Sequence, residues 1–192
     1  TDHNLRIVDS DPFADVLSNN SPRLAALDQL DRVIYVGTFA KTLSASLRSG
    51  YIAANADTVA RLADLKMITR ANSSGYIEQI IYDLITSGRY RGHLKRLSGR
   101  IEAATRQAND SLARLGLPVF GQPRGGFYMW CELPPHIDDT QLSRVAAERS
   151  ILLAPGSAFN PDAIPATPAM RVNIAHVGDP RFESFMAEHR NP

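Results

Sequence analysis

The sequence predicts an α/β fold: the end of a helix-covered sheet layer, joined by a long helix to a small α+β unit. Three observations predict it. Three short apolar or β-branched runs occur within the first 54 residues, and three segments with apolar residues three or four positions apart follow them. After Pro118 the long helical patterns give way to short strands and loops. We therefore expect one domain over residues 1–95 and a second over residues 96–192.

The predicted strands of the first domain cover residues 5–8, 32–36 and 50–54. Their apolar character is nearly continuous rather than alternating, as in Arg32-Val33-Ile34-Tyr35-Val36. Continuous apolar strands are typical of a sheet that is covered on both faces. The sequence thus predicts helices on both sides of this sheet.

Helical spacing predicts three helices after these strands, over residues 57–68, 73–87 and 93–115. Gly116 and Pro118 end the longest of them. The remaining chain predicts strands at 126–133, 151–153 and 170–174, with helices at 139–150 and 179–189.

Composition excludes several classes of function. Lys and Arg number 21 and Asp and Glu number 20, so the net charge of +1 gives no electrostatic argument for nucleic acid or an anionic membrane. The single cysteine, Cys131, excludes an internal disulfide, and the five histidines show no metal-ligand spacing, so we expect no metal. No apolar run approaches the roughly 20 residues of a membrane helix. We expect a cytoplasmic protein with no membrane contact.

The most informative stretch follows the predicted strand 32–36. The strand ends at Gly37, and Thr38, Lys41 and Arg48 come after it. Ligands of open α/β sheets bind outside the carboxyl ends of the strands, so this loop lies where a site would be. A lysine can act there as a nucleophilic amine, and a hydroxyl with an arginine can hold a phosphate. Each residue taken alone is also compatible with an ordinary surface position.

This stretch resembles the lysine region of fold-type I pyridoxal-phosphate (PLP) enzymes, the aminotransferase class I and II group. The pattern Ser/Thr-Phe-Ser-Lys followed by Gly-x-Arg-x-Gly appears as Thr38-Phe39-Ala40-Lys41 and Ser46-Leu47-Arg48-Ser49-Gly50. The resemblance implies that Lys41 is the catalytic residue and forms the internal aldimine with PLP. It also implies that Thr38 and Arg48 contact the cofactor phosphate, and that residues 1–95 are the end of the PLP-binding large domain.

Three further segments resemble the same family in the same order. They are Gly125-Gly126-Phe127-Tyr128-Met129-Trp130, Leu153-Ala154-Pro155-Gly156-Ser157-Ala158-Phe159 and Met170-Arg171-Val172-Asn173-Ile174-Ala175. The resemblance implies that Arg171 binds the α-carboxylate of the substrate, an amino acid or keto acid. A planar guanidinium suits that role because it makes two parallel hydrogen bonds to a carboxylate.

The segment Val8-Asp9-Ser10-Asp11-Pro12-Phe13 departs from the family pattern. The family places an aspartate at the pyridine nitrogen and a tyrosine three residues later, and the alignment puts Ser10 and Phe13 at these cofactor-binding positions. Asp9 and Asp11 flank Ser10, and a bulge would be needed to present Asp11. A serine at the nitrogen gives a weaker electron sink. Our hypothesis is that the site binds PLP but transaminates poorly.

Residues 85–97, together with 171–175 and 179–182, resemble the aminotransferase-like domain of MocR-type regulators of the GntR group. That resemblance implies the C-terminal half of a PLP-binding domain, a homodimer, and DNA contact only through a domain upstream of this chain. Three roles stay open on the sequence: a PLP-sensing regulator, a stand-alone aminotransferase of 2-amino acids, and a catalytically inactive structural segment.

Overall fold

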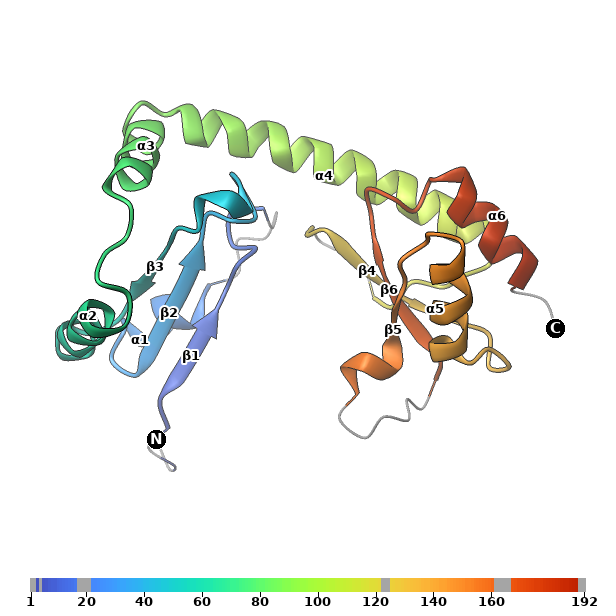
Figure 1. Cartoon of the computed structure of the whole chain (residues 1–192), viewed down its shortest axis with the longest axis horizontal. Helices are drawn as coiled ribbons and strands as arrows, with labels where there is room; N and C mark the ends of the chain where they lie inside the picture. Colours follow the sequence, from blue (N-terminus) through green and yellow to red (C-terminus); the bar gives the residue numbers. More distant parts are fainter. Residues whose placement is uncertain (1–2, 4, 17–21, 122–124, 161–166, 190–192) are drawn as a thin grey trace. The chain divides into compact units, whose positions relative to one another are not determined.

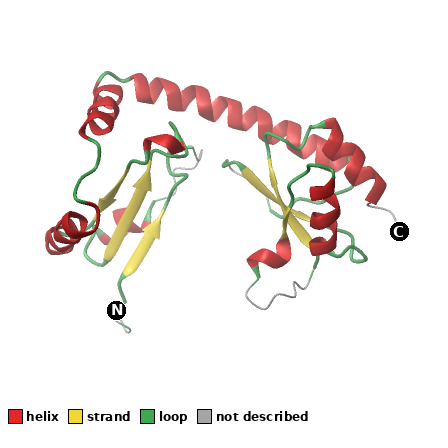
Figure 2. Cartoon of the chain, in the orientation of Figure 1, coloured by secondary structure: helices red, strands yellow, loops and turns green. Residues whose placement is uncertain are grey.

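The computed structural model describes residues 3, 5–16, 22–121, 125–160 and 167–189 of the chain. Contacts divide the chain into two compact units, Thr1–Ser98 and Gly99–Pro192, here called the first unit and the second unit. The predicted α/β fold is confirmed: each unit combines a three-stranded sheet with helices (Figures 1 and 2). Among the described residues, no helix combines the length and apolar character that crossing a membrane requires.

The first unit is built on a sheet of order β1-β2-β3. The strands are β1 (Ile7–Ser10), β2 (Val33–Thr38) and β3 (Gly50–Ala53). β1 is parallel to β2 and β3 is antiparallel to it. The helices are α1 (Leu24–Asp28), α2 (Ala56–Arg70) and α3 (Gly75–Thr86), and Ala45–Leu47 forms a short 3₁₀ helix, η1.

Local capping explains where these elements begin. The Asp28 carboxylate accepts hydrogen bonds from the backbone N–H groups of Arg32 (2.6 Å) and Val33 (2.8 Å), which fixes the turn into β2. The Asn55 side chain accepts from the Thr58 N–H (2.9 Å) and caps α2. β2 then buries Val33, Tyr35 and Gly37 and leaves the residues between them half-buried.

The longest helix, α4, covers Arg89–Arg114 and passes from the first unit into the second. It begins four residues earlier than predicted, directly after Gly88, whose positive φ of 74° breaks the path from α3. The apolar spacing that predicted this helix starts only at Leu94, so the pattern missed its first turn.

The second unit packs a sheet of order β4-β6-β5 against helices. The strands are β4 (Tyr128–Glu132), β5 (Ala154–Pro155) and β6 (Ala169–Asn173), all antiparallel. The helices are α5 (Asp139–Glu148) and α6 (Pro180–His189), with a 3₁₀ helix η2 at Gly156–Phe159. Its core centres on Leu112, Cys131, Met170, Phe185 and Met186, each at most 1% exposed.

The predicted strand at 151–153 was wrong. The backbone N–H of Ile151 donates to the carbonyl of Ala146 (2.9 Å), and Ser150 adopts a positive φ of 60°, so these residues finish α5. The Ser143 hydroxyl donates a hydrogen bond to the carbonyl of Leu153 (3.0 Å), and strand pairing begins only at Ala154. The apolar run Ile-Leu-Leu indicated a strand, but its first residue, Ile151, is hydrogen-bonded to the end of α5 instead.

Candidate functional site

The loop after β2 is closed at its base by Thr38. The Thr38 hydroxyl accepts from the Ala40 N–H (3.1 Å) and donates to the carbonyl of Ser49 (3.3 Å). The Phe39 N–H donates to the same carbonyl (3.1 Å). Thr38 thus shapes the turn that carries Lys41, and a role for its hydroxyl at a phosphate stays a prediction.

Lys41 presents its amine beside the loop that follows β1. The side chain is exposed, and its Nζ lies 5.8 Å from the centroid of the Phe13 ring. No carboxylate among the described residues forms an ion pair with it. The structure therefore brings together two residues singled out in the sequence, 28 positions apart.

Arg48 lies at the end of η1 in an unusual backbone conformation. Its φ and ψ of 48° and 36° are left-handed, which costs a non-glycine residue about 1–2 kcal/mol. Its side chain is exposed, and the described part of the chain gives it no acidic partner. Backbone strain at an exposed arginine is the kind of outlier that marks functional sites.

Two glycines let the strands beside this loop approach closely. A Cβ at Gly50 would lie 2.6 Å from the Gly37 carbonyl oxygen, and one at Gly37 would lie 2.3 Å from Cζ of Tyr51. A side chain at Gly50 would push β3 away from β2 and shift the loop between them, whereas one at Gly37 would displace the Tyr51 ring. This explains physically why a glycine follows Arg48 by two residues.

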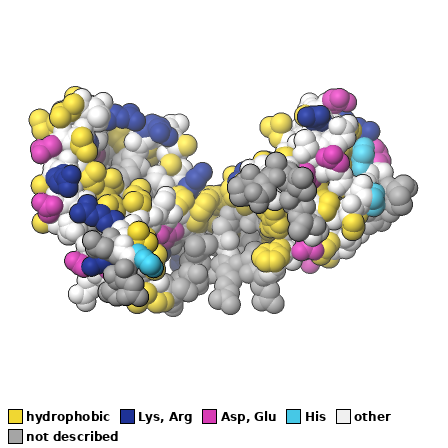
Figure 3. Space-filling view, turned by 90° about the horizontal axis from the view of Figure 1, so that it is seen from below, with side chains coloured by type: hydrophobic (Ala, Val, Ile, Leu, Met, Phe, Trp, Pro, Cys, Tyr) yellow, Lys and Arg dark blue, Asp and Glu magenta, His cyan; other side chains and the backbone are white. Residues whose placement is uncertain are grey.

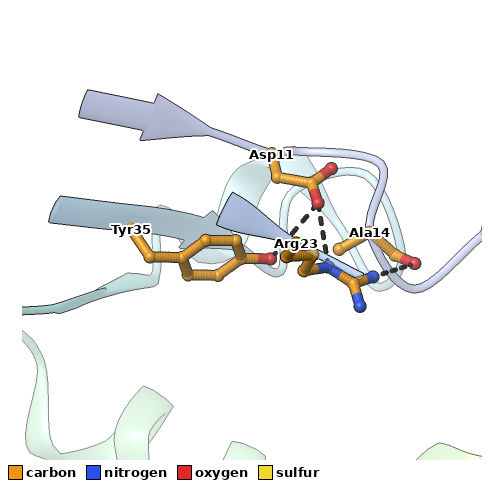
Figure 4. A network of polar contacts seen from close by, with 4 residues as sticks. All are labelled: Asp11, Ala14, Arg23 and Tyr35. Carbon is orange, nitrogen blue, oxygen red and sulfur yellow. Dashed lines mark hydrogen bonds and ion pairs between the residues drawn. The ribbon is translucent and has the colours of Figure 1, made fainter. Parts of the chain in front are cut away.

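Asp9, Ser10 and Asp11 are the three residues that the sequence offers for the position at the pyridine nitrogen, and the structure places them differently. Asp11 lies past the end of β1, where its Oδ2 accepts from Arg23 Nε (3.0 Å) and from the Tyr35 hydroxyl (3.5 Å) (Figure 4). Arg23 also donates to the carbonyl of Ala14 (3.0 Å). Burial raises the pKa of Tyr35 to about 12, so its hydroxyl stays a donor. The Asp11 carboxylate is therefore already engaged.

Strand register places Ser10 on the face of the sheet opposite to that of Asp9 and Tyr35. Ser10 pairs with Val36 and Asp9 pairs with Tyr35, and paired residues in adjacent strands point to the same side. Alternation then places Thr38 on the face of Ser10, at the carboxyl ends of two parallel strands. The Ser10 hydroxyl is exposed and makes no hydrogen bond with the described residues.

Two residues that the sequence did not single out, Tyr90 and His93, hold Thr42, the neighbour of Lys41. The Tyr90 hydroxyl lies 2.9 Å from the Thr42 Oγ1 and 2.7 Å from the Asp15 Oδ2. The His93 Nε2 lies 2.6 Å from the Thr42 carbonyl oxygen. Burial raises the pKa of Tyr90, so this phenol stays protonated. These contacts join residues that are 48 to 75 positions apart in the sequence, so no local sequence pattern predicts them.

Arg171 belongs to the second unit, on β6. Its guanidinium carbon lies 4.3 Å from the centroid of the Tyr128 ring and 4.9 Å from that of Phe159. The backbone N–H of Ser157, in the turn before Phe159, donates to the buried Asp139 carboxylate (3.0 Å). Arg171 also lines a cavity of about 310 Å³ with Asn173 and His176.

The predicted site residues thus fall in both units. Ser10, Phe13, Thr38, Lys41 and Arg48 belong to the first unit and gather at the carboxyl ends of β1 and β2, whereas Arg171 belongs to the second. Within the described ranges no cluster of three or more His, Cys, Asp or Glu side chains could hold a metal ion.

Comparison with known proteins decides the family. The model of the aminotransferase class I and II family matches residues 3–187. The chain belongs to this family. The resemblance inferred from the lysine motif is therefore confirmed, and the chain is an aminotransferase-like domain.

Similar sequences with curated descriptions are transcriptional regulators. The HTH-type transcriptional regulator YdfD of Bacillus subtilis (strain 168) is 28% identical over 159 residues, covering 81% of this chain and 33% of the regulator. The HTH-type transcriptional regulator NorG of Staphylococcus aureus (strain USA300) is 26% identical over 162 residues, covering 80% and 36%. The chain spans about a third of the length of these relatives.

Similar structures are aminotransferases. The Pyrococcus horikoshii kynurenine aminotransferase superposes with a TM-score of 0.84 at 20% identity, covering 100% of this chain and 50% of that one. The α-aminoadipate aminotransferase LysN of Thermus thermophilus gives 0.82 at 21% identity, covering 97% and 50%. At such identities the likeness shows the fold, and this chain corresponds to half of each enzyme.

Proposed function

We propose that the chain is the PLP-binding effector domain of a GntR/MocR-type transcriptional regulator. Lys41 holds the cofactor covalently, Arg48 and Thr38 contact its phosphate, and Arg171 binds the α-carboxylate of an amino acid. One observation carries the proposal: an exposed amine without an acidic partner among the described residues lies at the carboxyl ends of two parallel strands, beside Phe13. The regulator part of the proposal is supported by the curated relatives.

The donor set fits the chemistry of PLP. When bound, PLP supplies an aldehyde that condenses with a primary amine as water leaves, and a pyridine ring that accepts electrons. Lys41 offers the amine. Arg48, in its strained backbone conformation, offers a fork of N–H donors that suits a phosphate dianion. Phe13 offers an apolar surface beside the amine.

Ser10 is the residue we assign to the pyridine nitrogen. It shares its sheet face with Thr38, and its hydroxyl is available, whereas Asp11 is engaged by Arg23 and Tyr35. A hydroxyl donates a hydrogen bond to a neutral nitrogen but supplies no charge to hold a proton there. The Ser10 hydroxyl would thus leave a bound ring a weak acceptor of electrons, which favours sensing of an amino acid over its turnover.

The alternative is a stand-alone PLP-dependent aminotransferase of 2-amino acids, and the fold shared with kynurenine aminotransferase favours it. In both cases the ligand is an amino acid or keto acid, and the protein is proposed to be a homodimer in the cytoplasm. In the regulator, DNA contact belongs to a helix-turn-helix segment outside this chain.

Titration of the full-length protein with PLP tests the proposal. Covalent attachment to an amine should produce a new absorbance band in the visible range. Lys41→Arg should abolish the band, whereas Lys66→Arg, on the exposed surface of α2, should leave it unchanged. A band that survives in Lys41→Arg would contradict the proposal.

Single-turnover reaction with amino donors separates sensor from enzyme. The wild-type protein should convert slowly to the amine form of the cofactor, and Ser10→Asp should raise the rate at least about tenfold, or about 1.4 kcal/mol of barrier. Ser10→Ala is the matched control and should not raise the rate. Fast wild-type turnover with a keto acid would favour the stand-alone enzyme.

A further inference from the structure

Residues in the first two turns of α4 make hydrogen bonds to the turn that carries Lys41. Thr42 follows Lys41 directly and is 4% exposed, so its polar groups must find partners inside the protein. The Thr42 N–H donates to the Phe39 carbonyl within the turn (3.3 Å). The other two partners come from α4: the Tyr90 hydroxyl meets the Thr42 Oγ1, and the His93 Nε2 meets the Thr42 carbonyl oxygen. Residues three apart lie on one face of a helix, so a single surface of α4 makes both contacts.

The direction of each hydrogen bond follows from donor counting. The Tyr90 hydroxyl has one proton, and it donates that proton to the Asp15 carboxylate. The Thr42 hydroxyl must therefore donate to the Tyr90 oxygen. A carbonyl only accepts, so His93 must carry its proton on Nε2 and donate it to Thr42. Every link in the chain His93–Thr42–Tyr90–Asp15 is thereby defined.

Tyr90 connects the loop that carries Lys41 to the loop that carries Phe13. Asp15 stands two residues after Phe13, in the loop that follows β1, and Thr42 stands in the loop that follows β2. The Tyr90 ring also packs edge-on against Phe39, two residues before Lys41, with ring centroids 5.9 Å apart. The turn is thus anchored on both sides of Lys41, while the amine itself stays exposed.

We propose that Tyr90 and His93 are positioning residues for Lys41, which fix its turn against the Phe13 loop so that the amine can reach the aldehyde carbon of PLP. This inference rests on the proposed function of Lys41. An anchored turn lowers the conformational cost of bringing the amine to the cofactor. Loss of either anchor should weaken the covalent step and spare noncovalent contacts to the phosphate and ring.

Two forms of the cofactor separate these effects. Pyridoxamine phosphate carries the same ring and phosphate as PLP but has no aldehyde, so it cannot condense with Lys41. We expect Tyr90→Phe in the full-length protein to weaken PLP binding about tenfold in equilibrium dialysis. Pyridoxamine phosphate binding should change less than about twofold. Equal losses for the two ligands would assign Tyr90 a merely structural role and overturn the inference.

Matched variants control for loss of a hydroxyl or an imidazole elsewhere. Tyr82→Phe removes an exposed hydroxyl on α3, and His136→Ala removes an exposed imidazole; neither should alter PLP affinity. His93→Ala should weaken PLP binding by about the same factor as Tyr90→Phe. His93→Gln should restore most of the affinity, because its amide N–H can replace the Nε2 donor.

A double-mutant cycle identifies Lys41 as the residue through which Tyr90 acts. In the Lys41→Arg background, Tyr90→Phe should leave PLP affinity unchanged, because no amine remains to be positioned. A further loss in that background would overturn the inference while leaving the proposed function intact. If wild-type PLP binding is insensitive to Lys41→Arg, the proposed function and the inference both fail.

Discussion

The two units bury their apolar residues to very different extents. The second unit closes a core around side chains such as Leu112, Met170, Phe185 and Met186. In the first unit the described buried apolar residues are Val16, Val33, Tyr35 and Ile81. Large apolar side chains are exposed there on β1, α2 and α3, among them Val8, Met67, Ile68 and Tyr76. Figure 3 shows hydrophobic side chains (yellow) on the surface of this unit.

The second unit thus contains most of the buried core, and the first contains most of the candidate site residues. We expect the second unit to fold by itself, because its core is deeply buried. The first unit exposes more apolar surface than scattered residues account for, and we expect it to depend on further protein surface. The candidate cofactor-binding residues all belong to the first unit, and the candidate substrate-binding residue Arg171 belongs to the second. Its loops are held by the polar contacts of Thr38, Thr42 and Asp11 rather than by a deep core.

Expression of the two parts separately should give the largest contrast. Residues 89–192, which contain the whole of α4, should unfold cooperatively in urea, followed by fluorescence of Trp130, the single tryptophan of the chain. Residues 1–98 alone should aggregate or bind a hydrophobic dye. A cooperative transition in the 1–98 fragment would break the comparison.

Truncation of single apolar side chains should show the same contrast at smaller scale. Leu112→Ala removes a fully buried side chain and should lower the free energy of unfolding by about 2–5 kcal/mol in the Trp130 transition. Ile68→Ala removes one that is 82% exposed and should cost less than about 0.5 kcal/mol. Similar losses for the two variants would mean that Ile68 is covered in the full-length protein.

High pH should destabilise the second unit through its buried thiol. Burial raises the pKa of Cys131 to about 12 from an ordinary value of 9.0. The stabilisation is complete below pH 9, where both states are protonated, and falls as pH rises towards 12 because only the unfolded chain releases its proton. Wild type should lose about 1 kcal/mol per pH unit above 9 more than Cys131→Ala does. Parallel pH profiles for the two proteins would exclude this effect.

Sequence patterns predicted the elements whose signals are local. β2, the helices α2 to α6 and the lysine turn are encoded in neighbouring residues, and the fold and family predicted from them are confirmed, whereas the short α1 was not predicted. The strand predicted at 151–153 failed because the end of α5 competes for the same residues. The contacts of Tyr90 with Asp15 and of Asp11 with Arg23 and Tyr35 depend on chain crossings that no local pattern carries.

Borohydride trapping tests the central claim most directly. The chain contains three lysines, Lys41, Lys66 and Lys95, so the full-length protein can be reduced in the presence of PLP and the modified peptide mapped by mass spectrometry. We predict the phosphopyridoxyl adduct on Lys41 at a stoichiometry near one. An adduct on any other lysine, Lys66 and Lys95 included, or none at saturating PLP, would contradict the assignment of Lys41 as the residue that binds the cofactor.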